Sequence, residues 1–233
     1  MKIFSWNIRH GGGKRINGIL LELEDNQDSK IIVLTEFRNN QNGHRIRDKL
    51  NQLGFIYQYS PIINPRVNSL LIASKIAVTF REYPELDKHQ HRVISAEWND
   101  SLVFGTYFPQ KNEKSQVFQF LIQKVKAASL KSMIIVAGDM NTGVPFKDEK
   151  GKSFYCAKDF DQLQKEGVTD AWRLINDEKT EYSWFSNHGN GFRIDHFLIS
   201  NQFQSKVNAC YYIHEARLNR ISDHSQMCLI IED

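Results

Sequence analysis

Residues 133–141 read Met-Ile-Ile-Val-Ala-Gly-Asp-Met-Asn, an apolar run that ends abruptly in Asp139 and Asn141. A continuous apolar run of this kind is typical of a strand buried on both faces of a sheet. Similar apolar runs lead into Asn7 and into Glu36. Polar residues just past the carboxyl ends of buried strands lie where open α/β sheets build their sites. These stretches therefore predict a sheet core with a polar site at one edge.

The rest of the chain predicts a mixture of strands and helices. Helical spacing of apolar residues occurs over 16–23, 42–53, 113–129 and 157–166, and loops are expected at the glycines 11–13 and over 142–156. Helices between some strands and hairpin turns between others imply mixed sheets, with helices outside a two-layer β core. No linker divides residues 1–233, so we expect a single domain. The expected strands are 2–8, 30–36, 55–60, 68–74, 77–81, 92–98, 101–107, 132–138, 181–185, 193–200, 206–213 and 226–232.

Composition excludes little about function. The chain carries 30 basic and 27 acidic side chains, a net charge of +3 that is too mild to identify a nucleic-acid binder. The three cysteines lack metal-ligand spacing, which predicts free thiols in a reducing compartment. No signal-peptide pattern is present, and no apolar run approaches the ~20 residues that span a bilayer. We expect a cytoplasmic monomer without a membrane partner.

Six short motifs occur in a fixed order along the chain. Each is weak alone, because Asp and Asn are favoured turn residues. The motifs are Ser5-Trp6-Asn7, Leu34-Thr35-Glu36, Gly105-Thr106-Tyr107-Phe108-Pro109, Gly138-Asp139-Met140-Asn141, Gly191-Phe192-Arg193-Ile194-Asp195 and Ser222-Asp223-His224. As an ordered series they resemble the endonuclease/exonuclease/phosphatase superfamily, which includes exonuclease III, the AP endonucleases and DNase I. The resemblance extends over nearly the whole chain.

The resemblance implies an α+β fold, a four-layer αββα sandwich with two mixed β-sheets packed face to face and helices outside. It also implies hydrolysis of a phosphate ester with Mg²⁺ or Mn²⁺ as cofactor. By this resemblance the metal ligands are Glu36, Asp223 and Asn7: Glu36 is the principal ligand, Asp223 lies nearby, and Asn7 would also help to hold that carboxylate or the phosphate. Oxygen ligands of this kind suit a hard cation, which keeps part of its shell for water and substrate.

Five further residues take catalytic roles by the same resemblance. Asp139 would orient and deprotonate the attacking water, and Asn141 would hold that water or a phosphate oxygen. His224 would contact the phosphate as imidazolium or act as general base, and Asp195 would bind its other ring nitrogen. Tyr107 would donate a hydrogen bond to the phosphate.

The candidate substrate-binding residues are Arg9, Asn68, Trp184, Phe192 and Ile194. Arg9 stands where AP endonucleases commonly carry an acid, so it favours phosphate contact over a second metal; an ordinary solvated basic loop is the alternative. The two aromatic residues and Ile194 match the apolar positions that line the AP endonuclease pocket. Aromatic residues in strand-like runs are more often core, which is the competing interpretation.

Other features qualify this interpretation. Only residues 186–191 connect Phe185 with Phe192. Relatives that act on abasic DNA have a longer loop at this place, so abasic specificity is not supported. His89 and His91 lack a ligand cluster and are expected at the surface. His196 should point away from the site, on the opposite face of its strand from Asp195.

Three functions remain at this stage. A deoxyribonuclease, endo- or exonucleolytic, that hydrolyses DNA phosphodiesters by metal-assisted in-line attack of water is favoured. A phosphomonoesterase, or a lipid phosphodiesterase acting on phosphoinositide or sphingomyelin, is the alternative on the same scaffold. A non-catalytic nucleic-acid-binding module is the third; such a module would normally lack the equivalent of Glu36, Asp139 or His224, and all three are present.

Overall fold

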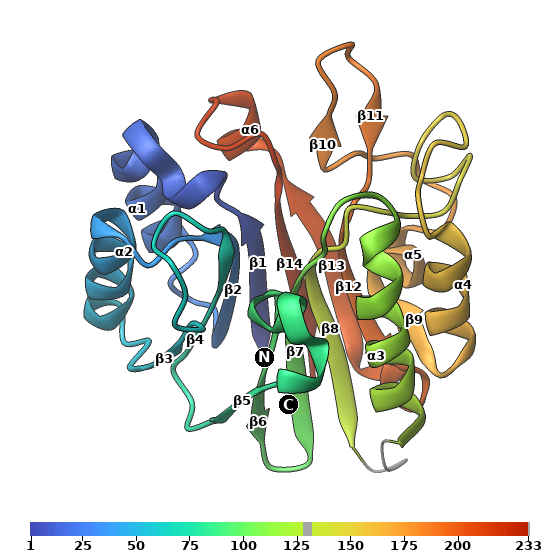
Figure 1. Cartoon of the computed structure of the whole chain (residues 1–233), viewed down its shortest axis with the longest axis horizontal. Helices are drawn as coiled ribbons and strands as arrows, with labels where there is room; N and C mark the ends of the chain where they lie inside the picture. The colour runs from blue at the N-terminus through green and yellow to red at the C-terminus, as the bar shows by residue number, and fades with distance from the viewer. Residues whose placement is uncertain (128–131, 233) are drawn as a thin grey trace.

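Two six-stranded sheets form the centre of the computed structural model, which describes residues 1–127 and 132–232 (Figure 1). The first sheet has the order β13 (Val207–Ile213), β14 (Gln226–Ile231), β1 (Lys2–Asn7), β2 (Ile31–Phe37), β4 (Ser69–Ser74) and β3 (Tyr57–Tyr59). The second has the order β5 (Thr79–Glu82), β6 (Val93–Trp98), β7 (Ser101–Tyr107), β8 (Met133–Asp139), β12 (Asp195–Ser200) and β9 (Val168–Asp170). A small hairpin joins β10 (Trp184–Phe185) to β11 (Gly191–Phe192).

Both sheets are mixed, as predicted. β1 runs parallel to β2 and β7 runs parallel to β8, while the other pairs of neighbouring strands are antiparallel. The parallel pairs matter for the site, because they bring the carboxyl ends of strands to one end of the sandwich.

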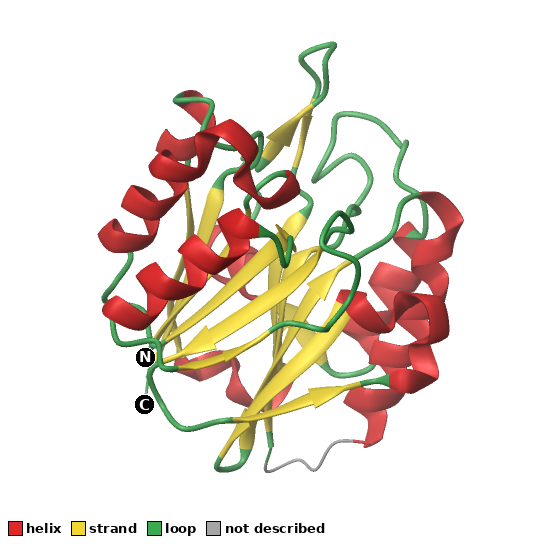
Figure 2. Cartoon of the chain, turned by 60° about the vertical axis from the view of Figure 1, so that its left-hand side comes forward, coloured by secondary structure: helices red, strands yellow, loops and turns green. Residues whose placement is uncertain are grey.

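Helices cover the outer face of each sheet (Figure 2). The first sheet packs against α1 (Ile16–Asp25) and α2 (Gln41–Gln52), and the second against α3 (Lys114–Ala127) and α4 (Ala157–Lys165). Two short helices are α5 (Ala171–Asn176) and α6 (Glu215–Leu218). Tight 3-10 turns occupy His10–Arg15, Pro84–Arg92, Lys111–Glu113 and Asn201–Lys206.

Three apolar clusters explain the layers. Along β1, Ile3 enters the cluster between the two sheets, whereas Phe4 and Trp6 pack against the helices of the first sheet. Along β8, Ile135 faces the inner cluster and Val136 faces the helices of the second sheet. Each central strand is thus buried on both faces, which is why its sequence is continuously apolar. The four-layer sandwich expected from the motifs is confirmed.

Several short elements were not predicted. β9 pairs with β12 over only three positions, and α5 begins where the Asp170 side chain accepts hydrogen bonds from the backbone N–H groups of Trp172 and Arg173. Elements this short lack a periodic pattern, and tertiary contacts hold them. The strand expected over 181–185 comprises only Trp184 and Phe185. The last two residues of the helix expected over 113–129 lie outside the described residues.

Two expectations about histidines have opposite outcomes. His89 is buried rather than at the surface, because residues 84–92 pack against β6 and α3, and burial lowers the pKa of the half-buried His91 to about 4. The surface assignment of His89 was wrong. His196 does point away from the site: its ring nitrogens contact Asp170 Oδ2 at 3.3 Å and the Thr142 carbonyl at 2.8 Å.

The state of the cysteines and the length of the helices agree with what the sequence predicts. Cys156, Cys210 and Cys228 are free thiols, and burial raises the pKa of each. Within the described ranges, no helix is both long and apolar enough to cross a bilayer.

A buried ionic cluster holds the segment that leads into β12. The Arg193 guanidinium contacts Asp148 Oδ1 at 2.7 Å and Asp170 Oδ2 at 2.5 Å, and all three side chains are almost fully buried. Burial alone would raise the pKa values of the two carboxyl groups, but Arg193 and His196 together outweigh it and lower both. The cluster ties the 142–156 loop and β9 to the strand that carries Asp195.

We expect Arg193→Met to lower the free energy of unfolding by about 3–5 kcal/mol at pH 7, because it leaves the buried Asp170 carboxylate without its guanidinium partner and Asp148 with Arg173 alone. Urea denaturation measures the loss. In the wild type, the lowered pKa values mean that this stabilisation is present above the unfolded-state pKa of about 4 and is lost as the pH falls below it. The control Arg81→Met breaks a surface pair with Glu97 and should cost less than about 1 kcal/mol. Equal losses in the two variants would contradict a structural role for the cluster.

Candidate active site

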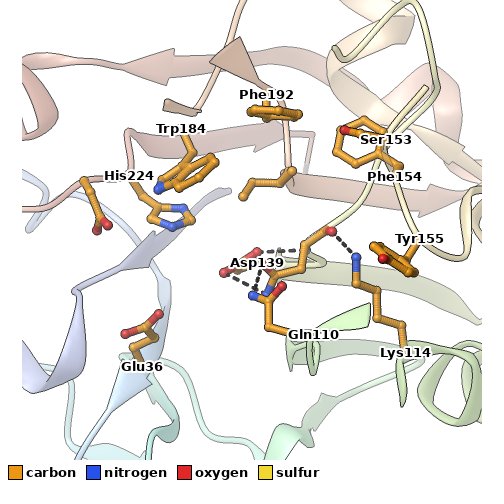
Figure 3. Close-up of a pocket in the computed structure, with 13 residues that line it drawn as sticks. Glu36, Gln110, Lys114, Asp139, Ser153, Phe154, Tyr155, Trp184, Phe192 and His224 are labelled. Atoms are coloured by element: carbon orange, nitrogen blue, oxygen red, sulfur yellow. Dashed lines mark hydrogen bonds between the residues drawn. The ribbon is translucent and has the colours of Figure 1, made fainter. Parts of the chain in front are cut away.

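The strand-end residues of both sheets meet around one pocket of about 330 Å³ (Figure 3). The first sheet contributes Glu36 on β2. The second contributes Asp139 at the end of β8, which stands directly opposite Asp195 in the β8–β12 register. The complete lining is Glu36, Gln110, Lys114, Asp139, Asn141, Ser153, Phe154, Tyr155, Trp184, Phe192, Ile194, Asp223 and His224.

Glu36 is aimed at the pocket by an irregularity in its strand. The β2–β4 register shifts between Thr35 and Phe37, and Glu36 has a φ of +55°, a left-handed conformation that is strained for a residue with a side chain. Its Oε2 accepts hydrogen bonds from the His10 backbone N–H at 2.8 Å and from Asn68 Nδ2 at 2.9 Å. The bulge thus places a carboxylate among fixed donors at the pocket edge.

Asn7 and Tyr107 hold the other oxygen of Glu36. Oε1 lies 3.3 Å from Asn7 Nδ2 and 3.4 Å from the Tyr107 hydroxyl. Asn7 Oδ1 accepts from the Arg9 backbone N–H, so the amide nitrogen, which is not a metal ligand, faces the carboxylates. This geometry differs from our prediction of Asn7 as a ligand and agrees with its other expected role, holding the Glu36 carboxylate.

Asp139 is buried and fixed on several sides. Asn7 Nδ2 donates to its Oδ2 at 2.9 Å, and the backbone N–H of Asn141 donates to its Oδ1 at 2.8 Å. Burial, with smaller contributions from Asp195 and Glu36, raises the pKa of Asp139 to about 7 against the opposing effect of His224. A carboxyl group with such a pKa can exchange a proton near neutral pH.

His224 and Asp195 form a buried pair in which Nδ1 lies 2.9 Å from Oδ2. Burial by itself lowers the pKa of an imidazolium, but Asp195, together with Asp139 and Asp223, outweighs it and raises the pKa of His224 to about 10. His224 is therefore a cation at neutral pH. Ser222 fixes this loop by donating to the Asn7 carbonyl at 2.6 Å.

The donor set could hold a divalent cation. Asp139, Asp195 and His224 offer ligand atoms within 4.8 Å of one another and form a buried group that could hold a metal ion. A protonated imidazole is not a ligand, which weighs against that position. Across the described ranges, Glu36 forms an ion pair with His10 and with no lysine or arginine. A carboxylate that faces a pocket without such a partner fits a hard cation.

The remaining predicted polar residues lie at the pocket margin. Asp223 lines the pocket, and its Oδ2 is 3.6 Å from the Arg9 guanidinium. Asn68 contacts Glu36 rather than open space, so the structure places it beside the expected metal ligand, not on the substrate-facing wall. Burial raises the pKa of Tyr107 to about 12, which keeps its phenol protonated.

An aromatic wall closes one side of the pocket. Trp184, Phe192 and Ile194 all line it, and the two aromatic rings lie 5.6 Å apart between centroids. Figure 3 shows Trp184 and Phe192 above His224. The competing core interpretation was wrong for Trp184 and Phe192: both are half-buried because their hairpin projects from the end of the sandwich. Phe154 extends the wall at 5.7 Å from Phe192.

Sequence reasoning missed two residues that support Asn141, whose φ of +52° is also left-handed. Gln110 Nε2 donates to its Oδ1 at 2.6 Å, and the Lys114 ammonium donates to its carbonyl. Gln110 follows the Tyr-Phe-Pro motif directly, a signal that could have identified it. Lys114 had no such signal, because a lysine at a helix start is normally exposed, whereas this one is 2% exposed and burial lowers its pKa to about 8.

We expect Asp195→Asn to lower the pKa of His224 by about 1–3, because the substitution removes the largest of the charges that oppose the effect of burial. The ring of His224 can be followed by NMR titration, with the exposed His44 as the internal control. An unchanged His224 titration would mean that Asp195 does not set its protonation state.

Comparisons with known proteins agree with the fold. Three similar solved structures are an AP endonuclease from Archaeoglobus fulgidus (TM-score 0.83, 20% identity), a variant of the 3′ phosphatase NExo from Neisseria bound to a product DNA hairpin (0.83, 22%), and the 3′-5′ exonuclease NExo from Neisseria meningitidis (0.81, 21%). Each alignment covers 100% of both chains, and at these identities it shows the shared fold. The model of the Endonuclease/Exonuclease/phosphatase family matches residues 4–224, and the chain therefore belongs to this family of hydrolytic enzymes.

Proposed function

We propose that the protein is a divalent-metal-dependent deoxyribonuclease that hydrolyses DNA phosphodiester bonds. The observation that carries the reaction class is the pocket itself, in which a buried Asp195–His224 pair and a proton-exchanging Asp139 face the Glu36 carboxylate. Acid–base groups and an oxygen-ligand site within one cavity are what metal-assisted hydrolysis of a phosphate ester requires.

Glu36 and Asp223 would hold the metal ion, which is Mg²⁺ or Mn²⁺ in this proposal. The bound ion would polarise the phosphoryl oxygen and offset charge on the leaving group. Asn7 acts on this site by orienting Glu36 and Asp139 together through one amide nitrogen.

The chain's own residues would supply the proton transfer and the charge stabilisation. Asp139 would take the proton of the attacking water, since it is held by Asn7 and Asn141 and titrates near neutral pH. The imidazolium of His224, kept charged by Asp195, would donate to a phosphate oxygen as negative charge develops there. The Tyr107 phenol, which stays protonated, would donate a further hydrogen bond.

Two features support DNA as the substrate. The aromatic wall of Trp184 and Phe192 offers flat apolar surface to a sugar or a base beside the reacting phosphate. The similar structures include an AP endonuclease, a 3′-5′ exonuclease and a 3′ phosphatase bound to a product DNA hairpin. Arg9, whose guanidinium lies 3.6 Å from the pocket residue Asp223, would contact a backbone phosphate.

A substrate panel tests the proposal directly. It contains duplex, single-stranded, abasic and 3′-phosphate DNA, RNA and a phosphoinositide, each with Mg²⁺ and with EDTA. We expect hydrolysis of DNA phosphodiesters with Mg²⁺, none with EDTA, and DNA binding that weakens as salt rises. Activity restricted to the lipid, or to removal of a terminal phosphate, would favour the alternative functions. Activity that persists in EDTA would contradict the metal.

We expect Glu36→Gln, Asp139→Asn and His224→Ala each to lose at least about 100-fold in turnover, the scale of removing an acid–base or electrostatic group. Steady-state rates on the preferred DNA measure this, and circular dichroism checks the fold. Asp161→Asn, on the exposed face of α4, is the matched control and should retain full activity. Wild-type turnover in any two of the three variants would exclude these roles.

A further inference from the structure

Lys114 is a buried cation that has no carboxylate partner among the described residues. It is only 2% exposed, although it lines the pocket. An ammonium group can donate three hydrogen bonds, and within residues 1–127 and 132–232 this one has a single acceptor, the Asn141 carbonyl. Asp139 attracts the charge through space without a hydrogen bond to it. Two of the three donors of Lys114 are therefore left for a group that enters the pocket.

The position of Lys114 is unfavourable for a cation. It stands at the start of α3, where the positive end of the helix dipole opposes a positive side chain. Burial opposes the charge as well, and it lowers the pKa of Lys114 to about 8 in spite of the attraction by Asp139. A buried charge is stable when an opposite charge pairs with it. Because no described residue pairs with Lys114, an anion bound in the pocket would supply the missing partner.

Support of Asn141 does not by itself require a charge. A neutral amide such as glutamine can donate the same kind of hydrogen bond to the Asn141 carbonyl without the cost of burying an ion. A buried group whose pKa is displaced and which faces a cleft is typical of a functional site. The charge of Lys114, rather than its hydrogen bond, therefore points to a ligand.

The place of Lys114 in the pocket indicates which anion this ligand is. Figure 3 shows Lys114 on the far side of Asp139 from Glu36 and His224, among which the proposed function places the reacting phosphate. In a nucleic-acid strand, the anion nearest to a reacting phosphate is the next phosphate, one nucleoside away. The aromatic wall extends from above His224 to Phe154, on the side of the pocket where Lys114 lies. A sugar or base between the two phosphates would lie along this wall.

We propose that Lys114 is the centre of a second anion subsite, which binds the phosphate next to the reacting one along the same strand. The inference rests on the proposed function in placing the reacting phosphate at Asp139 and His224. It deepens that function, because a site that contacts two successive phosphates selects a polynucleotide over a molecule with a single phosphate.

Two variants separate the charge of Lys114 from its hydrogen bond. Lys114→Gln removes the charge and keeps a donor for the Asn141 carbonyl, and Lys114→Met removes both. Lys126→Met is the matched control, because Lys126 lies on the same helix and forms a surface ion pair with Glu166. Thermal unfolding checks that every variant is folded.

Calorimetry in EDTA with thymidine 3′,5′-bisphosphate and the two thymidine monophosphates gives a readout independent of activity. We expect the wild type and Lys126→Met to bind the bisphosphate about tenfold or more tightly than either monophosphate, because a further charge-assisted hydrogen bond forms. In both Lys114 variants this preference should fall below about threefold. Equal binding of the three ligands by the wild type, or a preference that Lys114→Gln retains, would overturn the inference.

Cleavage of modified DNA tests the same contact in a strand. End-labelled DNA carries one uncharged methylphosphonate beside the measured bond, on one side or on the other. On one side only, we expect the methylphosphonate to weaken apparent binding about tenfold or more in the wild type and less than about threefold in Lys114→Gln. Equal losses in the two proteins would mean that Lys114 only supports Asn141, and the inference would fail.

The two experiments distinguish this inference from the proposed function. If the wild type cuts no DNA but its preference for the bisphosphate depends on Lys114, the proposed function fails and the anion subsite stands. If the wild type cuts DNA with Mg²⁺ and Lys114→Gln keeps the wild-type preference, the proposed function stands and the subsite fails.

Discussion

One amide group joins the two halves of the site. Asn7 ends a strand of the first sheet, and its Nδ2 lies between Glu36 of the same sheet and Asp139 of the second. The contact exists only if the two sheets pack face to face at a fixed distance and register. The apolar cluster between the sheets provides that packing, so the chemistry at the end of the sandwich depends on residues such as Ile3 and Ile135 along its length.

The electrostatics of the pocket follow from burial. Water exclusion raises the pKa of Asp139, and the same exclusion strengthens the attraction by which Asp195 keeps His224 charged. One carboxyl group becomes able to exchange a proton near neutral pH, while an imidazole remains a cation well above it. Two groups with displaced pKa values and opposite tasks are typical of acid–base sites.

Several residues of the site have a strained backbone conformation. His10, Glu36 and Asn141 all have positive φ values, and each is held by neighbouring polar groups. Other residues of the chain, such as Asp87 and Asn99, share this conformation at turns. What distinguishes the site is that its strained residues are fixed by side chains from other elements, Asn68 at Glu36 and Gln110 and Lys114 at Asn141. These supports lie on different elements, and no local sequence pattern links them.

The sequence by itself determined the sheet core and the ends of its strands, because an apolar run followed by Asp or Glu is a local pattern with a direct physical cause. The order of the motifs predicted the αββα layers, and the structure and the family match confirmed them. Only the tertiary structure decided which way each polar side chain points. It turned the Asn7 oxygen away from the carboxylates, placed Trp184 and Phe192 in a pocket wall rather than in the core, and buried Lys114 and His89. These outcomes depend on contacts between residues far apart in the chain, and the long-range packing that sets them leaves no periodic signal in the sequence.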